Sequence, residues 1–291
     1  MTDSSRRQFL LRTITSCGAG ALMLSACGCQ LFQHQLSDMT SRTSLLPQIP
    51  PSRNAVQLEV IIIERPQGDP LLEKSLWKEV DQIGALDPDV RDILQKNGFK
   101  VGVTASDPPE ALQTMVQQAI EKNKRQITHG QQAPSSLQKV ALLEGTSSDL
   151  QTSNFFSTCQ VTIQKKTGDV KKKTFENARC LFRVEAHRLQ EGWVTLQFIP
   201  EIQHGAKQLR HTAGKRNWKL TTSQAKYSLY EQQFEITLNM GEMAMISSQG
   251  ESPNSLGQQF FSETKEDKEA VQRLLVVRLV SIATAQGVKT E

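Results

Sequence analysis

The chain has 291 residues, of which 37% are hydrophobic and 22% charged, and its formal net charge is +4. No run approaches the roughly 20 consecutive apolar residues that a membrane-spanning helix requires, which excludes a polytopic membrane protein. The length suits one or two domains with buried cores, and the near balance of charges gives no reason to expect nucleic-acid binding.

Residues 1–26 have the parts of a bacterial export signal. A positively charged start is followed by uncharged residues 13–26, with small residues before Cys27, and this order is typical of a cleaved signal peptide. The segment SRRQFL, residues 5–10, resembles the twin-arginine (Tat) export consensus, with Arg6 and Arg7 as the paired arginines. An ordinary secretory signal with two arginines is the alternative.

The segment Leu24-Ser25-Ala26-Cys27 resembles a lipobox. This resemblance implies that Cys27 carries the lipid and becomes the amino terminus after cleavage, whereas a plain cleavage site is the alternative. Acyl chains contribute about 0.8 kcal/mol per buried methylene, so two or three would hold the protein on a membrane. We therefore expect a lipoprotein of the cell envelope, anchored to the membrane and facing the periplasm or the exterior. Residues 27–54 would form a flexible tether.

A small α/β domain is expected over residues 55–127. The runs VQLEVIIIE, residues 56–64, and FKVGVT, residues 99–104, predict buried strands. Helical spacing after Pro70, Asp87 and Asp107 predicts three helices, and Asn97-Gly98 is a suitable end for the second one. The predicted order is β-α-α-β-α.

A linker at residues 128–136 is expected to lead to a mainly antiparallel β domain over residues 137–285, so the predicted fold class is α+β. Residues 271–282 lack alternation, which predicts a central strand buried on both faces. Residues 247–268 are expected to form a mobile loop. The predicted strands cover residues 137–143, 158–167, 174–189, 192–203, 217–222, 233–247 and 270–283.

Cys159 and Cys180 lie on consecutive predicted strands around Gly168-Asp169. If the numbers of paired residues sum to 339, Cys159 faces Cys180 and the apolar residues of both strands share one face. A disulfide that closes a loop of about 20 residues would stabilise the fold by roughly 3 kcal/mol. Two buried free thiols are the alternative, because a shift of the turn changes the register.

No catalytic or metal site is predicted. The five histidines form no His-x-x-x-His pair, and the sequence has neither a Cys-x-x-Cys nor a Gly-x-Ser-x-Gly motif. Carboxylates such as Asp87 and Asp89 are suited to a helix N-terminus. We therefore expect a protein without a cofactor and without enzymatic activity.

Lysines at positions 165, 166, 171, 172 and 173 surround Asp169 at a predicted hairpin tip. Such a tip could contact anionic lipid headgroups or wall polymers, at about 1 kcal/mol for each lysine near the surface. The other interpretation is a solvated edge that prevents aggregation of strands.

Residues 60–103, which contain ERPQGDPLLEKSLWKEVD and NGFKVGV, resemble an uncharacterised family of bacterial exported proteins. That resemblance implies no activity. The turns RPQGDP, residues 65–70, and NGFKVGV, residues 97–103, have Gly and Pro at positions that set backbone angles. These turns could shape a binding surface, although their spacing does not suit a phosphate loop.

The C-terminal half resembles the β-domain of secretins, the ring-forming outer-membrane channels of secretion systems. The similar segments are VTLQFIPEI, residues 194–202, FEITLNMGEMAMIS, residues 234–247, LGQQFF, residues 256–261, and LLVVRLVSI, residues 274–282. The resemblance implies an antiparallel β domain, with residues 234–247 as a hairpin that turns at a glycine.

The combined prediction is a non-enzymatic, lipid-anchored envelope protein that binds or assembles with another envelope protein. Strand addition or sheet packing would be the mechanism, with Phe234, Ile236 and Leu238 in the core. A ring-forming channel component is one alternative. A ligand-binding or enzymatic module with a cleft between the two domains is the other.

Overall fold

The computed structural model describes residues 55–128, 136–143, 145–190, 192–213, 218–249, 253–264 and 269–283. The predicted signal peptide with Arg6 and Arg7, the lipidation site Cys27, the tether and most of the predicted linker lie outside these residues.

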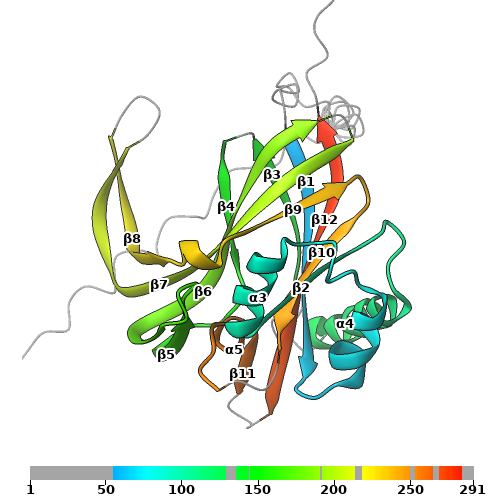
Figure 1. Ribbon diagram of the computed structural model, residues 1–291, viewed down its shortest axis with the longest axis horizontal. Coiled ribbons are helices and arrows are strands. Elements are labelled where there is room, and N and C mark those ends of the chain that lie inside the picture. Colours follow the sequence, from blue (N-terminus) through cyan, green and yellow to red (C-terminus); the bar gives the residue numbers. More distant parts are fainter. Residues whose placement is uncertain are drawn as a thin grey trace, which may run out of the picture. The chain divides into compact units, whose positions relative to one another are not determined.

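Antiparallel strands dominate the structure and form two sheets, which we call sheet A and sheet B (Figure 1). The order of sheet A is β2 (Phe99–Thr104), β10 (Met243–Ser248), β12 (Ala270–Ala283), β1 (Ala55–Pro66) and β3 (Ser136–Leu143), and β11 (Ser262–Thr264) pairs with β12. The order of sheet B is β4 (Ser147–Gln151), β6 (Val170–Gln190), β7 (Trp193–Ala213) and β8 (Trp218–Ser228), with β5 (Phe156–Gln164) on β6 and β9 (Phe234–Asn239) on β7.

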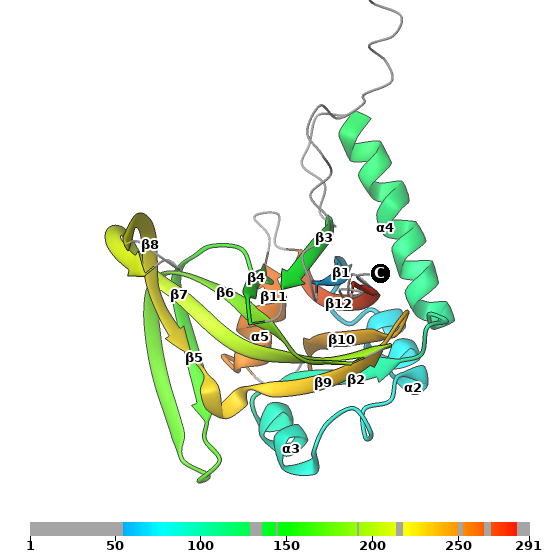
Figure 2. The same cartoon turned by 90° about the horizontal axis from the view of Figure 1, so that it is seen from above.

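Helices cover sheet A on one face and help to fill the space between the sheets on the other (Figure 2). The π-helical turn η1 (Leu71–Ser75), α2 (Leu76–Glu79) and α4 (Glu110–Thr128) lie on the outer face. The helices α3 (Pro88–Lys96) and α5 (Leu256–Phe261) pack on the side of sheet B, and the 3₁₀ turn η2 (Tyr230–Gln232) precedes β9.

The elements predicted over residues 56–104 are confirmed. Helix α3 begins as its sequence indicates: the Asp87 side chain accepts a hydrogen bond from the Asp89 amide at 3.0 Å and Pro88 occupies the first turn. Gly98, with φ of +80°, leads from the end of this helix into β2.

Strand β12 is the central strand of sheet A, as its lack of alternation predicted. Leu274 and Val276 face the helices η1, α2 and α4, whereas Leu275 and Val277 face sheet B. All four side chains are at most 1% exposed. A strand with protein on both faces has no solvent side, so its sequence carries no polar alternation.

The expected predominance of antiparallel strands is confirmed, but the α+β layout of two successive domains is not. Strand β1 pairs with β12 along its whole length, and β2 pairs with β10. The proposed α/β segment therefore shares sheet A with strands from the C-terminal end, and the described residues between 55 and 283 belong to one compact unit. The physical reason is that β1 buries apolar side chains on both faces: η1, α2 and α4 of the same segment cover one face, whereas the other face packs into the core that β1 shares with sheet B.

Residues 233–247 do not form the expected hairpin. Strand β9 pairs with β7 in sheet B, whereas β10 pairs with β12 and β2 in sheet A. The chain changes sheets at Gly241, which has φ of +90° and donates its amide to the Leu279 carbonyl at 2.8 Å. The glycine turn that suggested a hairpin therefore joins the two sheets.

Residues 253–264 do not form the mobile loop that the sequence predicted. They contain α5, whose Leu256, Phe260 and Phe261 are fully buried, and β11. The Ser255 hydroxyl caps this helix by accepting from the Gln258 amide at 3.2 Å. A helix of this length is too short for periodicity to reveal it, because it spans fewer than two turns.

Candidate functional site

A polar pocket of about 320 Å³ lies at the end of sheet A. Its walls come from the turn after β1, from η1 and α2, and from the ends of β10 and β12 nearest that turn, together with Lys100 of β2. The lining residues are Gln67, Gly68, Glu73, Trp77, Lys100, Ser248, Gln249 and Gln272.

The turn RPQGDP forms one side of this pocket because hydrogen bonds tie it to β12 and to η1. The Gln67 amide donates to the Ala270 carbonyl at 2.9 Å. Gly68 has φ of +83°, which favours glycine. Asp69 accepts from the Leu71 amide at 2.9 Å and thereby starts η1, which carries Glu73 to the pocket.

Gly102 explains how α2 is held close to β2. A Cβ atom at this position would lie 2.5 Å from Val80 Cγ1 and 2.8 Å from the Asp81 carbonyl oxygen. The backbones of Asp81 and Val103 exchange two hydrogen bonds, of 2.8 and 2.9 Å. The motif NGFKVGV therefore lets the end of α2 dock on β2, which places Trp77 beside Lys100.

Lys100 and Glu73 bring opposite charges to the pocket. The Lys100 ammonium lies 4.7 Å from the centroid of the buried Trp77 ring, a cation–π contact. Burial lowers the pKa of Lys100 because it disfavours the charged form, and the negative charge of Glu73 opposes that shift.

Gln272 leaves a hydrogen-bond acceptor unused at this pocket. Its side chain is buried, and its Nε2 donates to the Ser248 carbonyl at 2.9 Å and to the Ser248 Oγ at 3.1 Å. Its Oε1 accepts no hydrogen bond from the described residues. An unpaired buried acceptor costs about 1–3 kcal/mol, so a hydrogen-bond donor placed beside this oxygen would be stabilising.

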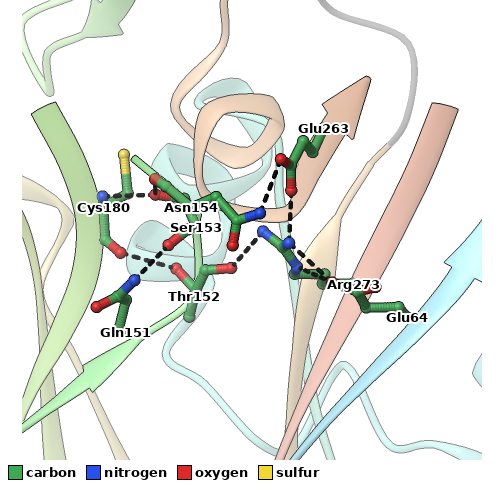
Figure 3. Close-up of polar contacts among 8 residues, drawn as sticks. All are labelled: Glu64, Gln151, Thr152, Ser153, Asn154, Cys180, Glu263 and Arg273. Atoms are coloured by element: carbon green, nitrogen blue, oxygen red, sulfur yellow. Dashed lines mark hydrogen bonds and ion pairs between the residues drawn. The ribbon is translucent and has the colours of Figure 1, made fainter. Parts of the chain in front are cut away.

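A second buried polar cluster differs from this pocket because its charged side chains form ion pairs (Figure 3). Arg273, on the opposite face of β12, donates Nε and Nη2 to Glu64 at 2.9 and 2.8 Å, and Nη2 to Glu263 at 2.5 Å. Its Nη1 donates to the Thr152 carbonyl at 3.1 Å. This cluster therefore fastens the chain after β4 to sheet A, and its role is structural.

Cys159 and Cys180 meet, although the predicted register is wrong. Cys159 pairs with Phe175, and Cys180 pairs with Ile202 of β7. The tight turn at residues 165–169 fixes the β5–β6 register, and the ladder with β5 ends at the pair Phe156–Ala178, two residues before Cys180.

The two sulfur atoms lie in the same core. Both thiols are free and buried, and the Cys159 Sγ donates to the Gln259 Oε1 at 3.5 Å. Burial raises the pKa of Cys180, whereas interaction with the Cys180 side chain lowers the pKa of Cys159. The predicted disulfide stays a prediction.

The lysine-rich turn forms a hairpin tip between β5 and β6, as expected. Lys166, Lys171 and Lys172 are exposed, and the Lys173 ammonium lies 3.7 Å from the centroid of the Tyr227 ring. Contact of this tip with lipid or wall polymers stays a prediction.

Strand β8 forms an edge of sheet B. Within the part of the chain that the structure describes, it pairs with β7 alone. Beyond a bulge at residues 204–208, residues 208–213 of β7 pair with residues 218–223 of β8, so the two strands continue as a two-stranded ribbon that projects from the sheet (Figure 1). Such a ribbon has little stability of its own in water.

The root of this ribbon is fixed by charges on the outer face of sheet B. Glu201 of β7 is fully buried, accepts from the Ser228 hydroxyl at 2.7 Å, and lies 3.4 and 3.5 Å from Lys226 and Arg183. These contacts connect β6, β7 and β8. The outer edge of β8 is therefore held in a defined position.

The sequence indicated this pocket only in part. The two glycine-containing turns were identified as a possible binding surface, and both contribute to its walls. No sequence pattern predicted Ser248 and Gln272 as pocket residues, because they reach the pocket through the pairing of β10 with β12. The described residues contain no group of three His, Cys, Asp or Glu side chains that could hold a metal ion.

Comparisons with known proteins found no matching family model, no similar curated protein and no similar solved structure. Among the described residues, no helix has the length and hydrophobicity to cross a membrane.

Proposed function

We propose that this protein is an exported, lipid-anchored component of the cell envelope that acts by binding another envelope protein and not by catalysis. The twin-arginine segment with Arg6 and Arg7 and the lipobox cysteine Cys27 support the location. The secretin-like segments in β7, β9, β10 and β12 support a role in assembly.

The outer edge of β8, which pairs with no strand among the described residues, is the observation that carries the proposed mechanism. An edge strand presents free N–H and C=O groups that a strand of another protein can pair with. Glu201 and its partners hold the root of β8 in place, whereas the ribbon beyond it gains stability from a further strand. The partner would therefore extend sheet B.

Metabolic labelling with palmitate tests the anchor. Cys27→Ala removes the acceptor sulfur and is expected to abolish incorporation of label. Cys29→Ala, two residues away in the tether, is the matched control and is expected to keep the label. Label that survives in the Cys27→Ala variant refutes the lipid anchor.

Photo-crosslinking in intact cells tests strand addition. A photoreactive side chain at the exposed Thr222 of β8 is expected to capture one partner of defined mass, whereas the same group at Ile83, which is 76% exposed, is not. Successive residues of an edge strand direct their N–H groups alternately toward the neighbouring strand and away from it. One of the two variants Thr222→Pro and Ser223→Pro therefore removes an N–H group that points away from β7. That variant keeps the hydrogen bonds between β7 and β8 and blocks only the outer edge of β8.

The edge-blocking variant is expected to unfold at the same urea concentration as the parent protein and to lose the crosslink. A crosslink that persists in both folded proline variants refutes strand addition. Heat-resistant multimers of this chain alone, on a denaturing gel of membranes, would instead identify a ring-forming assembly.

A further inference from the structure

The pocket between α2 and the ends of β10 and β12 combines three polar features. The half-buried Lys100 supplies a positive charge, Glu73 supplies a negative charge, and Gln272 Oε1 is a buried acceptor without a donor among the described residues. A ligand that matches all three must carry an anionic group together with several N–H or O–H donors.

The charges exclude simpler ligands. A plain anion would be attracted by Lys100 and repelled by Glu73, and a plain cation would meet the reverse. A neutral sugar brings no charge to either Lys100 or Glu73, and the face of Trp77 on which it would stack is occupied by the Lys100 ammonium, 4.7 Å from the ring centroid.

A zwitterion satisfies every group at once. Its carboxylate pairs with Lys100, and its ammonium has three donors, enough for Glu73 and for the Gln272 Oε1. The pocket volume of about 320 Å³ lies at the small end of the range for ligand sites. We propose that this pocket binds a small zwitterion with the head group of an α-amino acid, either a free amino acid or a dipeptide.

The desolvated lysine agrees with this proposal. Burial of Lys100 lowers its pKa, which means that the folded protein carries an electrostatic penalty at this position. A carboxylate bound beside the ammonium would remove that penalty. The site is separate from the β8 edge, so the proposal does not depend on the proposed partner binding.

Isothermal titration calorimetry of the full chain in detergent, with a panel of small probes, tests the proposal. The zwitterions are L-alanine and the dipeptides L-alanyl-L-alanine and D-alanyl-D-alanine. Propionate, propylamine and N-acetylglucosamine represent the anion, the cation and the neutral sugar. Saturable binding by a zwitterion but by none of the three others is expected, and the preferred zwitterion distinguishes an amino acid from a dipeptide.

Two charge-removing variants and two matched controls assign the binding to this pocket. Lys100→Met keeps an aliphatic side chain on Trp77, and Glu73→Gln keeps the shape of the side chain. Each is expected to weaken binding about tenfold or more, the loss of a charge-assisted hydrogen bond. Lys139→Met, at a lysine whose side chain is 80% exposed, and Glu79→Gln, at an exposed glutamate of α2, are expected to bind like the parent.

Three results would overturn the proposal: no binding by any zwitterion, equal or tighter binding of propionate, propylamine or the sugar, or unchanged zwitterion affinity in both pocket variants. Circular dichroism of each variant shows whether it is folded. If Lys100→Met does not fold, Glu73→Gln against Glu79→Gln decides the outcome.

Discussion

Phe182 of β6 connects both sheets and α5, so its replacement tests whether the protein has one core. The side chain is fully buried. Five other phenylalanine rings surround it, with centroid distances of 5.9 Å to Phe99, 6.3 Å to Phe198, 6.1 Å to Phe234, 5.2 Å to Phe260 and 6.0 Å to Phe261.

The expected cost of Phe182→Ala follows from these contacts. Large-to-small replacement of a buried phenylalanine lowers the free energy of unfolding by about 3–5 kcal/mol. Aromatic pairs add about 0.5–1.5 kcal/mol each beyond burial, and their effects are not additive. Because five rings lose a partner, we expect a loss of about 5 kcal/mol, which lowers Tm by about 10–20 °C in a unit of this size.

Urea unfolding, monitored by both circular dichroism and tryptophan fluorescence, measures this loss of unfolding free energy. The two signals are expected to change in a single coincident transition, because Phe99 from the N-terminal part of the fold and Phe260 from the C-terminal part contact the same ring. Phe155→Ala, at a side chain that is 59% exposed, is the control and is expected to change stability by less than about 0.5 kcal/mol.

Two results would refute the reasoning. A loss below about 1 kcal/mol in Phe182→Ala would mean that the rings do not pack as described. Two separate transitions, of which only one shifts, would restore the two-domain layout.

Three further predictions concern the remaining buried groups. Arg273→Met removes the cation between two carboxylates and is expected to lower the free energy of unfolding in urea by about 3–5 kcal/mol. The control Arg278→Met, at a side chain that is 46% exposed, is expected to lower it by less than about 0.5 kcal/mol. Equal losses in the two variants would contradict the structural role of Arg273. Cys159 and Cys180 are expected to be oxidised to a disulfide in protein isolated from the envelope, so the unfolded chain should react with a thiol reagent at these positions only after a reductant is added. Immediate labelling of both cysteines would show free thiols. Gly257→Ala would place a Cβ atom 1.8 Å from the Gly98 carbonyl oxygen and is expected to lower the free energy of unfolding by about 1–3 kcal/mol, and an unchanged Tm would show that α5 does not pack on that turn.

The sequence alone determined most of the local structure. Strands β1 and β2 and helix α3 lie where periodicity, Pro and Gly placed them, because these signals act over a few neighbouring residues. The absence of alternation in β12 also predicted correctly that this strand is buried on both faces. Residues 253–264 were predicted wrongly because α5 is too short to show a period.

Tertiary structure decided which strands pair. Residues 55–66 pair with residues 271–283 at the other end of the unit, and nothing local to either segment specifies that partner. In the same way, the β5–β6 register depends on the tight turn at residues 165–169. The two cysteines share the core without direct pairing, because Cys159 pairs with Phe175 and Cys180 pairs with Ile202 of β7.

The candidate site was likewise predicted in part by local sequence signals and decided in part by strand pairing. The turns that contain Gly68 and Gly102 were visible in the sequence, because a positive φ and a close backbone approach each favour glycine. Lys100 and Gln272 belong to one pocket only because β10 pairs with both β2 and β12. Pairing in a sheet is a contact between distant segments, and its free energy comes from the buried faces of the whole unit, which no local pattern in the sequence specifies.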